Sequence, residues 1–248
     1  MENQLKLFGL IGHNIAHSFS KQYFTERFQK DQLSDYAYQN FDIATIDAFP
    51  EVIKNNTNLA GLNVTIPYKE TIIPFLHQMS GKAFKIGAVN TIRFKKNGEL
   101  KGYNTDCYGF KKSLKPLLKP HHKKALILGT GGASKAVAFA LEELDILYIF
   151  VSREAVGNTI DYDRINATTF DNYQIIINCT PLGTWPNVAA FPLLPYEYFT
   201  DKHIAYDLIY NPGETVFLQK AAAQGAVIKN GMEMLKLQAE KAWKIWNK

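Results

Sequence analysis

The chain has 248 residues, 46% of them hydrophobic, which is enough for one large core or two smaller ones. Its formal net charge of +5 comes mostly from scattered lysines, and no long basic tract or basic motif with interleaved aromatic residues indicates a nucleic-acid partner. A basic protein still attracts an anionic substrate and cofactor. Cys107 and Cys179 stand far apart and in no metal-ligand spacing, which argues against a structural disulfide or a metal site.

No signal peptide and no apolar run long enough to span a bilayer is visible in the sequence. We therefore expect a cytoplasmic protein whose partner is a small molecule, with neither a nucleic acid nor a membrane as partner. The sequence does not decide between a monomer and a homodimer.

The chain begins with a predicted strand from Leu5 to Ile11, which opens onto a loop. A helix is predicted from Lys21 to Gln32, with Ser20 as its N-cap. Ser18 and Ser20 place two hydroxyls at a helix start, where they can hold a carboxylate without a formal positive charge. On this segment alone, the simpler interpretation is that both serines only cap the helix. A second strand at 36–44 and a short helix at 46–54 are predicted next.

Apolar residues alternate with Asn63 and Thr65 in the next predicted strand, so one of its faces is polar. Pro67 ends this strand, and Lys69 follows at its carboxyl end, where sites gather in open α/β sheets. Taken alone, a lysine after a proline turn is more often a solvated side chain.

Residues 69–79 indicate a helix that Pro74 interrupts. A β-hairpin is predicted around Asn97-Gly98, because both residues tolerate a positive φ. Asn104-Thr-Asp106 follows, and then an amphipathic helix from Tyr108 to Leu118. We expect this helix to link two domains, because a basic, proline-marked stretch at 115–124 follows it.

A glycine-rich turn organises the second half of the sequence. The apolar run from Ala125 to Leu128 ends at Gly129, and an alanine-rich helix begins a few residues later. Gly129 and Gly131 stand at the first two glycines of the dinucleotide fingerprint, and Ser134 stands at the third. The amide groups of the helix start then face the phosphates. The alternative is a glycine turn that binds nothing.

The next predicted strand ends in Ser152-Arg153. An arginine here favours NADP over NAD, because a guanidinium can chelate the 2′-phosphate that a carboxylate would repel. Glu154 tempers this prediction, since it can pair with Arg153 or reach a hydroxyl itself. Further strands at 174–178 and 204–209 and helices at 215–224 and 232–246 complete a strand-helix alternation.

Several of these segments, in this order, resemble the shikimate dehydrogenase family. They are Ser18-Phe-Ser20, Asn63-Val-Thr-Ile-Pro-Tyr-Lys69, Gly87-Ala-Val-Asn90-Thr, Asn104-Thr-Asp106, Gly129-Thr-Gly-Gly-Ala-Ser134, Tyr206-Asp-Leu-Ile-Tyr210-Asn-Pro and Gly231-Met-Glu-Met234 with Gln238. The resemblance implies a two-domain α/β fold. Residues 1–106 form the substrate domain, 107–230 a Rossmann-type NADP-binding domain, and 231–248 a C-terminal helix that packs back on the first. It also implies NADP-dependent, reversible reduction of 3-dehydroshikimate to shikimate, on the way to chorismate and aromatic amino acids.

The resemblance assigns roles to individual residues. Lys69 and Asp106 become the catalytic pair. Ser18 and Ser20 bind the substrate carboxylate, helped by Tyr210, while Thr65, Asn90 and Gln238 take the ring hydroxyls. The residues implied for NADP are Gly129, Gly131, Gly132, Ala133, Ser134, Ser152, Arg153, Gly231 and Met234; no metal is implied.

The chemistry of ketone reduction supports the lysine independently. Hydride delivered to carbon requires a proton on oxygen, and a lysine is protonated at neutral pH and can donate it. The neutral amine can accept the proton in the reverse direction, and a neighbouring carboxylate, Asp106, would orient the amine.

The sequence also departs from the family pattern. Segment 154–173 is shorter than the family pattern and lacks the basic residue that often follows the first arginine, Arg153, and Asn230 and Glu233 are unusual in the C-terminal motif. Two alternatives therefore stay open: a quinate/shikimate dehydrogenase that prefers NAD, and a non-catalytic nucleotide-binding relative.

Overall fold

A computed structural model describes residues 5–16, 18–155, 157 and 159–248. The chain divides into two compact units. The first unit is Met1–Thr105 with Ala239–Lys248, and the second is Asp106–Gln238. The division falls at Asp106 and within the last helix, whereas the sequence predicted boundaries after residues 106 and 230. The basic stretch at 115–124, predicted to follow the link between domains, lies inside the second unit.

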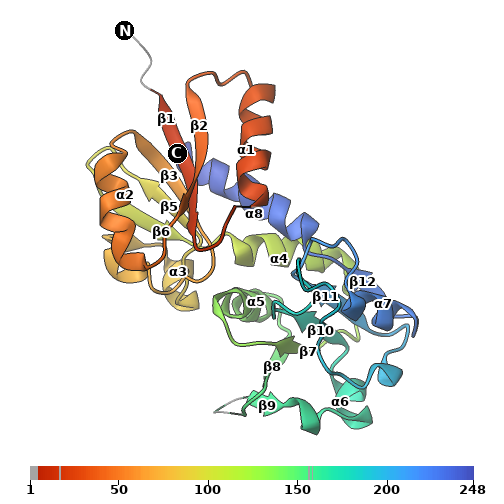
Figure 1. Ribbon diagram of the computed structural model, residues 1–248. Coiled ribbons are helices and arrows are strands. Elements are labelled where there is room, and N and C mark those ends of the chain that lie inside the picture. Colours follow the sequence, from red (N-terminus) through yellow and green to blue (C-terminus); the bar gives the residue numbers. More distant parts are fainter. Residues whose placement is uncertain (1–4, 17, 156, 158) are drawn as a thin grey trace. The chain divides into compact units, whose positions relative to one another are not determined.

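The first unit is built on a six-stranded sheet of order β2-β1-β3-β5-β6-β4. Figure 1 labels β1, β2, β3, β5 and β6 of this sheet. β1 runs parallel to β2 and β3, and β5 runs antiparallel to β3 and β6. The strands are β1 (Lys6–Gly12), β2 (Tyr36–Asp42), β3 (Leu59–Val64), β4 (Gln78–Met79), β5 (Thr91–Phe94) and β6 (Leu100–Tyr103). The α-helices that accompany it are α1 (Phe19–Lys30), α2 (Phe49–Asn55), α3 (Gly81–Ile86) and the last turns of α8 (Met232–Trp246).

Alternate side chains of β1 supply two separate cores, because successive residues of a strand point to opposite faces. Leu7 and Ile11 join a cluster with Phe49 of α2. Phe8 lies in an aromatic cluster with Phe24, Phe28 and Tyr38, which Trp246 of α8 completes. Trp246, close to the end of the chain, therefore packs in the same hydrophobic core as Phe8 of the first strand.

One predicted element of this unit differs from the structure. The helix predicted at 69–79 is wrong: only a 3₁₀ turn, η2 (Ile73–Phe75), forms there, and β4 follows it. Pro74 lacks an amide hydrogen and disfavours helical backbone before it, so the helix does not form. The strand β3 is buried on both faces, so its polar residue Asn63 lies inside the fold.

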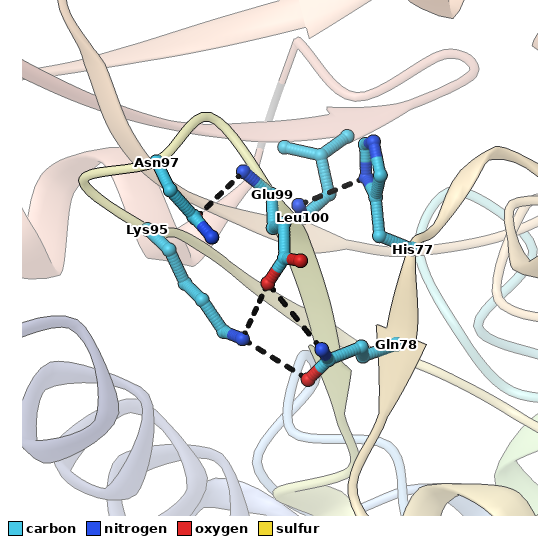
Figure 2. Close-up of polar contacts among 6 residues, drawn as sticks. All are labelled: His77, Gln78, Lys95, Asn97, Glu99 and Leu100. Carbon is cyan, nitrogen blue, oxygen red and sulfur yellow. Dashed lines mark hydrogen bonds and ion pairs between the residues drawn. The ribbon is translucent and has the colours of Figure 1, made fainter.

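The predicted hairpin between β5 and β6 is present, but only Gly98 of its turn has a positive φ, +81°. Lys95 donates to Glu99 at 2.7 Å, and Gln78 of β4 contacts both side chains (Figure 2). The hydrogen bond from Lys95 lowers the pKa of Glu99. This polar cluster ties β4 to the hairpin.

The second unit holds a six-stranded sheet of order β12-β11-β10-β7-β8-β9, in which every neighbouring pair is parallel. Numbered within the unit, this is the 3-2-1-4-5-6 order of the Rossmann fold. The strands are β7 (Lys124–Leu128), β8 (Leu147–Ser152), β9 (Thr159–Asp161), β10 (Ile175–Asn178), β11 (Ile204–Asp207) and β12 (Val227–Lys229). The helices are α4 (Asp106–Leu114), α5 (Gly132–Glu142), α6 (Ala167–Asn172) and α7 (Val216–Ala222), with 3₁₀ turns η3 (Lys115–Leu117), η4 (Tyr162–Arg164) and η5 (Tyr196–Tyr198).

The short segment noted in the sequence has a structural counterpart. Residues 153–158 alone join the parallel strands β8 and β9, a span too short for the usual crossover helix. Asn158, within this segment, lies outside the described residues. None of the helices in the described ranges is both long and apolar enough to cross a bilayer.

We predict that Gly61→Ala destabilises the first unit. A Cβ at residue 61 would collide with the indole of Trp246, whose Nε1 donates to the Ile92 carbonyl at 3.0 Å. Overpacking of this kind costs about 1–3 kcal/mol of the free energy of unfolding. Urea unfolding measures it, and Gly81→Ala, where an added Cβ meets nothing within 4 Å, is the control. Equal stability of the two variants would contradict the packing argument.

Candidate functional site

The predicted substrate residues of the first unit gather at one edge of its sheet. The carboxyl ends of β1, β3 and β6 meet there with the amino end of β5, because β5 runs antiparallel to its neighbours. Ser18 follows β1, Lys69 follows β3, Asn90 precedes β5 and Thr105 follows β6. The topology therefore brings together segments that are distant in sequence.

The loop after β1 ends at the first turn of α1. The N-cap is Ser18, whose hydroxyl accepts from the Ser20 amide at 3.2 Å, so the prediction of Ser20 as N-cap is wrong. The helix starts two residues earlier than predicted, which places Ser20 inside its first turn, where its side chain is buried.

The segment after β3 is held by its backbone on both sides. The Thr65 amide donates to the Ile11 carbonyl at 2.9 Å, and the Val89 amide donates to the Lys69 carbonyl at 2.7 Å. Tyr68 turns inward and donates its hydroxyl hydrogen to the Ile43 carbonyl at 2.7 Å. Lys69 itself is half-buried. The lysine thus extends from a fixed backbone.

Asn90 and Thr105 form a buried hydrogen-bonded pair. The Asn90 Oδ1 accepts from the Thr105 amide at 2.7 Å, and its Nδ2 donates to the Thr105 Oγ1 at 2.9 Å. Asp106 follows directly as the first residue of α4 and is also buried. The pair therefore fixes the position of the chain just before Asp106, the second member of the predicted catalytic pair.

A polar chain that the sequence did not reveal runs beneath this edge. The Tyr38 hydroxyl donates to Asn63 Oδ1 at 2.8 Å, and Asn63 Nδ2 donates to the Asn90 carbonyl at 3.4 Å. Both Tyr38 and Asn63 are buried, and burial raises the pKa of Tyr38 well above its ordinary value. Tyr38 therefore remains a neutral hydrogen-bond donor. The alternation around Asn63 was the only available signal.

In the second unit, the glycine turn joins β7 to the start of α5 and leaves open space beside it. Gly129 has a φ of +101°, and its amide donates to the Val151 carbonyl at 2.8 Å. A Cβ at Gly131 would meet no protein atom within 4 Å, so the space beside the start of α5 is open. The Ser134 hydroxyl donates to the Gly131 carbonyl at 2.6 Å and braces the turn. Gly132 and Ala133 then begin the 11-residue α5, whose amide groups suit an anion.

Ser152 and Arg153 lie at the same edge of this sheet, at the end of β8. Arg153 is exposed, and Tyr162 lies close to it after β9. Burial raises the pKa of Tyr162, and the positive charge of Arg153 opposes that shift. The tyrosine was missed in the sequence because β9 was not predicted.

A buried network joins the ends of β10 and β11. Asp207 accepts from Thr215 at 2.6 Å, from the Ile209 amide at 3.0 Å and from Asn178 at 3.1 Å. Asn178 in turn accepts from the Thr180 hydroxyl at 2.6 Å, and Thr180 lies beside Gly129. The network thus supports the strand end next to the glycine turn. The polar residues after the apolar run at 174–178 were a usable signal for it.

The remaining predicted residues follow β11 or lie on α8. Gly231 donates its amide hydrogen to the Ile209 carbonyl at 2.9 Å, and a Cβ there would collide with the Leu208 carbonyl. Met234 and Gln238 are buried on α8, and Tyr210 is half-buried. Asn230, unusual for the family, accepts from the Met232 amide at 3.2 Å, and Glu233 pairs with Lys229.

Within the ranges that the structure describes, no group of three or more His, Cys, Asp or Glu side chains is arranged to hold a metal ion. The two cysteines are free thiols, and burial raises the pKa of the Cys179 thiol.

We predict that the stability of the protein depends on pH through Asp207. Burial raises its pKa from 3.8 to about 6, so the folded state binds this proton more tightly than the unfolded state. The contribution of Asp207 to the free energy of unfolding is therefore largest below pH 4 and falls as the pH rises through 6. A shift of about two units corresponds to a loss of up to about 3 kcal/mol.

Asp207→Asn removes this titration, because an amide stays neutral. Relative to the parent, this variant should gain about 2–3 kcal/mol between pH 4 and pH 7, measured by urea unfolding at both pH values. Asp201→Asn, on an exposed turn, is the control. A parent-to-variant difference that is the same at both pH values would contradict the assignment.

Comparisons with known proteins place these features in a family. Residues 10–92 match the family model of the shikimate dehydrogenase substrate binding domain. A shikimate dehydrogenase (NADP(+)) from Caldanaerobacter subterraneus subsp. tengcongensis is 37% identical over 268 residues, covering 99% of this chain and 93% of the relative.

Solved structures agree with this match. The shikimate dehydrogenase of Aquifex aeolicus superposes with a TM-score of 0.87 at 33% identity, covering 98% of this chain and 92% of that one. The shikimate 5-dehydrogenase of Thermus thermophilus, in complex with NADP(H) and shikimate, has a TM-score of 0.85 at 32% identity, covering 97% and 93%. The resemblance and the two-domain α/β fold predicted from the sequence are thus confirmed. The protein belongs to the shikimate dehydrogenase family.

Proposed function

We propose that this protein catalyses the NADP-dependent, reversible reduction of 3-dehydroshikimate to shikimate, a step toward chorismate and aromatic amino acids. The observation that carries the proposal is nearly full-length identity of 37% to a shikimate dehydrogenase (NADP(+)), in a chain whose motifs include Lys69 and Asp106.

In this proposal Lys69 donates a proton to the carbonyl oxygen during reduction and takes it back in the reverse direction. Asp106 holds the charge of the amine and accepts a hydrogen bond from a substrate hydroxyl. The fixed backbone on both sides of Lys69 supports this role, because proton transfer depends on precise placement.

The other side chains bind and orient the substrate. Ser18 and Ser20 donate to its carboxylate, with help from Tyr210. Thr65, Asn90 and Gln238 take the ring hydroxyls. The rigid Asn90–Thr105 pair supports this assignment, since a buried amide held at both ends keeps one orientation.

NADP supplies or accepts the hydride when bound, and the residues of the second unit fit it. Gly129, Gly131 and Gly132, with the start of α5 at Ala133 and Ser134, would hold the pyrophosphate. Ser152 and Arg153 would bind the 2′-phosphate, which supports NADP over NAD. Gly231 and Met234 would lie near the nicotinamide.

A cytoplasmic location and a monomeric or homodimeric state complete the proposal. The proposal also keeps the predicted domain boundaries after residues 106 and 230. The two compact units of the structure are divided before Asp106 and after Gln238.

The rival functions are separated by one set of rates. Steady-state turnover is measured for shikimate and for quinate, each with NADP and with NAD. The proposal expects the highest kcat/KM for shikimate with NADP. The highest value for quinate with NAD would favour the alternative dehydrogenase, and no turnover in any combination would favour a non-catalytic relative.

We predict that Lys69→Ala folds normally but loses about 10²- to 10⁴-fold in turnover, the usual contribution of a positioned acid or base. Lys85→Ala, which removes an exposed lysine from α3, is the matched control and should keep the parental rate. Turnover of the Lys69 variant within twofold of the parent would refute its role.

We predict that Arg153→Ala weakens NADP binding by about 1.5–3 kcal/mol, the range for a hydrogen bond to a charged group, with little effect on NAD. Titration of both cofactors measures this difference. Arg164→Ala, which removes an arginine paired with Asp161 in the same unit, should leave the ratio unchanged. Equal affinity of the parent for NADP and NAD would count against the assignment.

A further inference from the structure

The loop that carries Ser18 is held by a side chain outside the predicted site. Asp42, the last residue of β2, accepts two consecutive backbone amides of this loop. The Asn14 amide donates to one carboxylate oxygen at 3.0 Å, and the Ile15 amide donates to the other at 3.1 Å. His13 approaches the same carboxylate at 3.6 Å. Because each oxygen receives one amide, the carboxylate fixes both the position and the direction of the loop.

A second side chain of the same strand also binds the backbone of this loop. Asn40 lies two residues before Asp42 and donates its Nδ2 hydrogen to the Ile15 carbonyl at 3.1 Å. The amide and the carbonyl of Ile15 are therefore both bound by β2, and its side chain is buried in the aromatic cluster. Asn14 adopts a left-handed φ of +56°, a conformation that non-glycine residues rarely take without support.

The loop held by Asp42 and Asn40 is hydrogen-bonded to two segments of the predicted site, one at Ser18 and one just before Lys69. The Ser18 amide donates to the same Ile15 carbonyl at 3.1 Å. The position of Ser18 therefore depends directly on that of Ile15. On the other side, the His13 amide donates to the Ile66 carbonyl at 3.2 Å, between Thr65 and Lys69 in sequence. The loop is thus fixed relative to the segment that carries the lysine.

The charge of Asp42 makes the arrangement unexpected. A carboxylate near a site for an anionic substrate repels that substrate, and Asp42 is exposed enough for this to matter at low salt. Its amide partners offset part of the charge. An acid in such a place is better explained by the backbone amides that it binds than by its charge.

We propose that Asp42 is a positioning residue of the substrate site, which acts through the loop at 13–16 to place the Ser18 hydroxyl on the substrate carboxylate. This inference rests on the proposed role of Ser18. A Ser18 hydroxyl placed in this way recognises a carboxylate at that end of the ligand. The site should therefore prefer an acid to its uncharged ester.

The test compares shikimate with its methyl ester as substrates of the full-length protein, with NADP saturating. Asp42→Asn keeps the shape of the side chain but offers only one acceptor to the two amides. It should raise the KM for shikimate about 5- to 20-fold and leave kcat and the KM for NADP within twofold. The preference for shikimate over the ester should fall by a similar factor.

Asp42→Glu is the second variant, because it keeps the charge and moves the carboxylate by one methylene; it should change KM in the same direction. Asp47→Asn removes an exposed acid a few residues further along the same unit and should leave the KM unchanged, which controls for net charge. Far-UV spectra and unfolding midpoints verify that each variant is folded.

Ser18→Ala is run in parallel so that two kinds of failure stay distinct. If Ser18→Ala lowers the preference for shikimate over the ester and Asp42→Asn does not, the positioning role is overturned while the proposed site stands. An Asp42→Asn variant with a lower KM for shikimate, or with kcat and both KM values changed together, would also overturn it. If Ser18→Ala leaves the preference unchanged, the role of Ser18 in the proposed function fails, and this inference fails with it.

Discussion

The hydrogen-bonded pair of Asn90 and Thr105 is the constraint on which the rest of the first unit's polar edge depends. Both side chains are buried, so an amide or hydroxyl without a hydrogen-bond partner here would lower the free energy of unfolding. The Asn90 carbonyl also accepts from the Val64 amide at 2.8 Å, at the end of β3. The strand that leads to Lys69 and the strand that leads to Asp106 are therefore joined through one asparagine.

The two units solve the same problem with different chemistry. In the first, the neutral side chains of Tyr38 and Asn63 form a buried hydrogen bond near the strand ends. In the second, a buried carboxylate, Asp207, gathers three donors at the ends of β10 and β11, and its raised pKa records the cost of burying it. A carboxylate can accept more hydrogen bonds than an amide, which explains its use where three donors meet.

Much of this organisation is visible in the sequence, because it depends on local patterns. The glycine turn at Gly129, the hairpin at Gly98 and the bounds of α8 all follow from short-range rules of turns and periodicity. The motif residues at the strand ends could be assigned to one site because the family resemblance connected these segments. The hydrophobic pattern of the sequence alone does not connect them.

What the sequence could not predict depends on contacts between distant segments. Ser18 and Ser20 are equally good caps, and only the observed start of α1 selects Ser18. Asn63 reads as one polar residue of an alternating strand, yet its partners come from β2 and from the turn before β5. Asp42 carries no motif at all, and its importance for the loop at 13–16 follows only from the pairing of β1 with β2.

The central claim is that the polar edge of the first sheet receives shikimate in one orientation. A crystal structure of the protein with shikimate bound tests this most directly. The account predicts the shikimate carboxylate within hydrogen-bond distance of the Ser18 and Ser20 hydroxyls, and the ring hydroxyls at Lys69 and Asn90. Shikimate bound in the reverse orientation, or away from this edge, would contradict it.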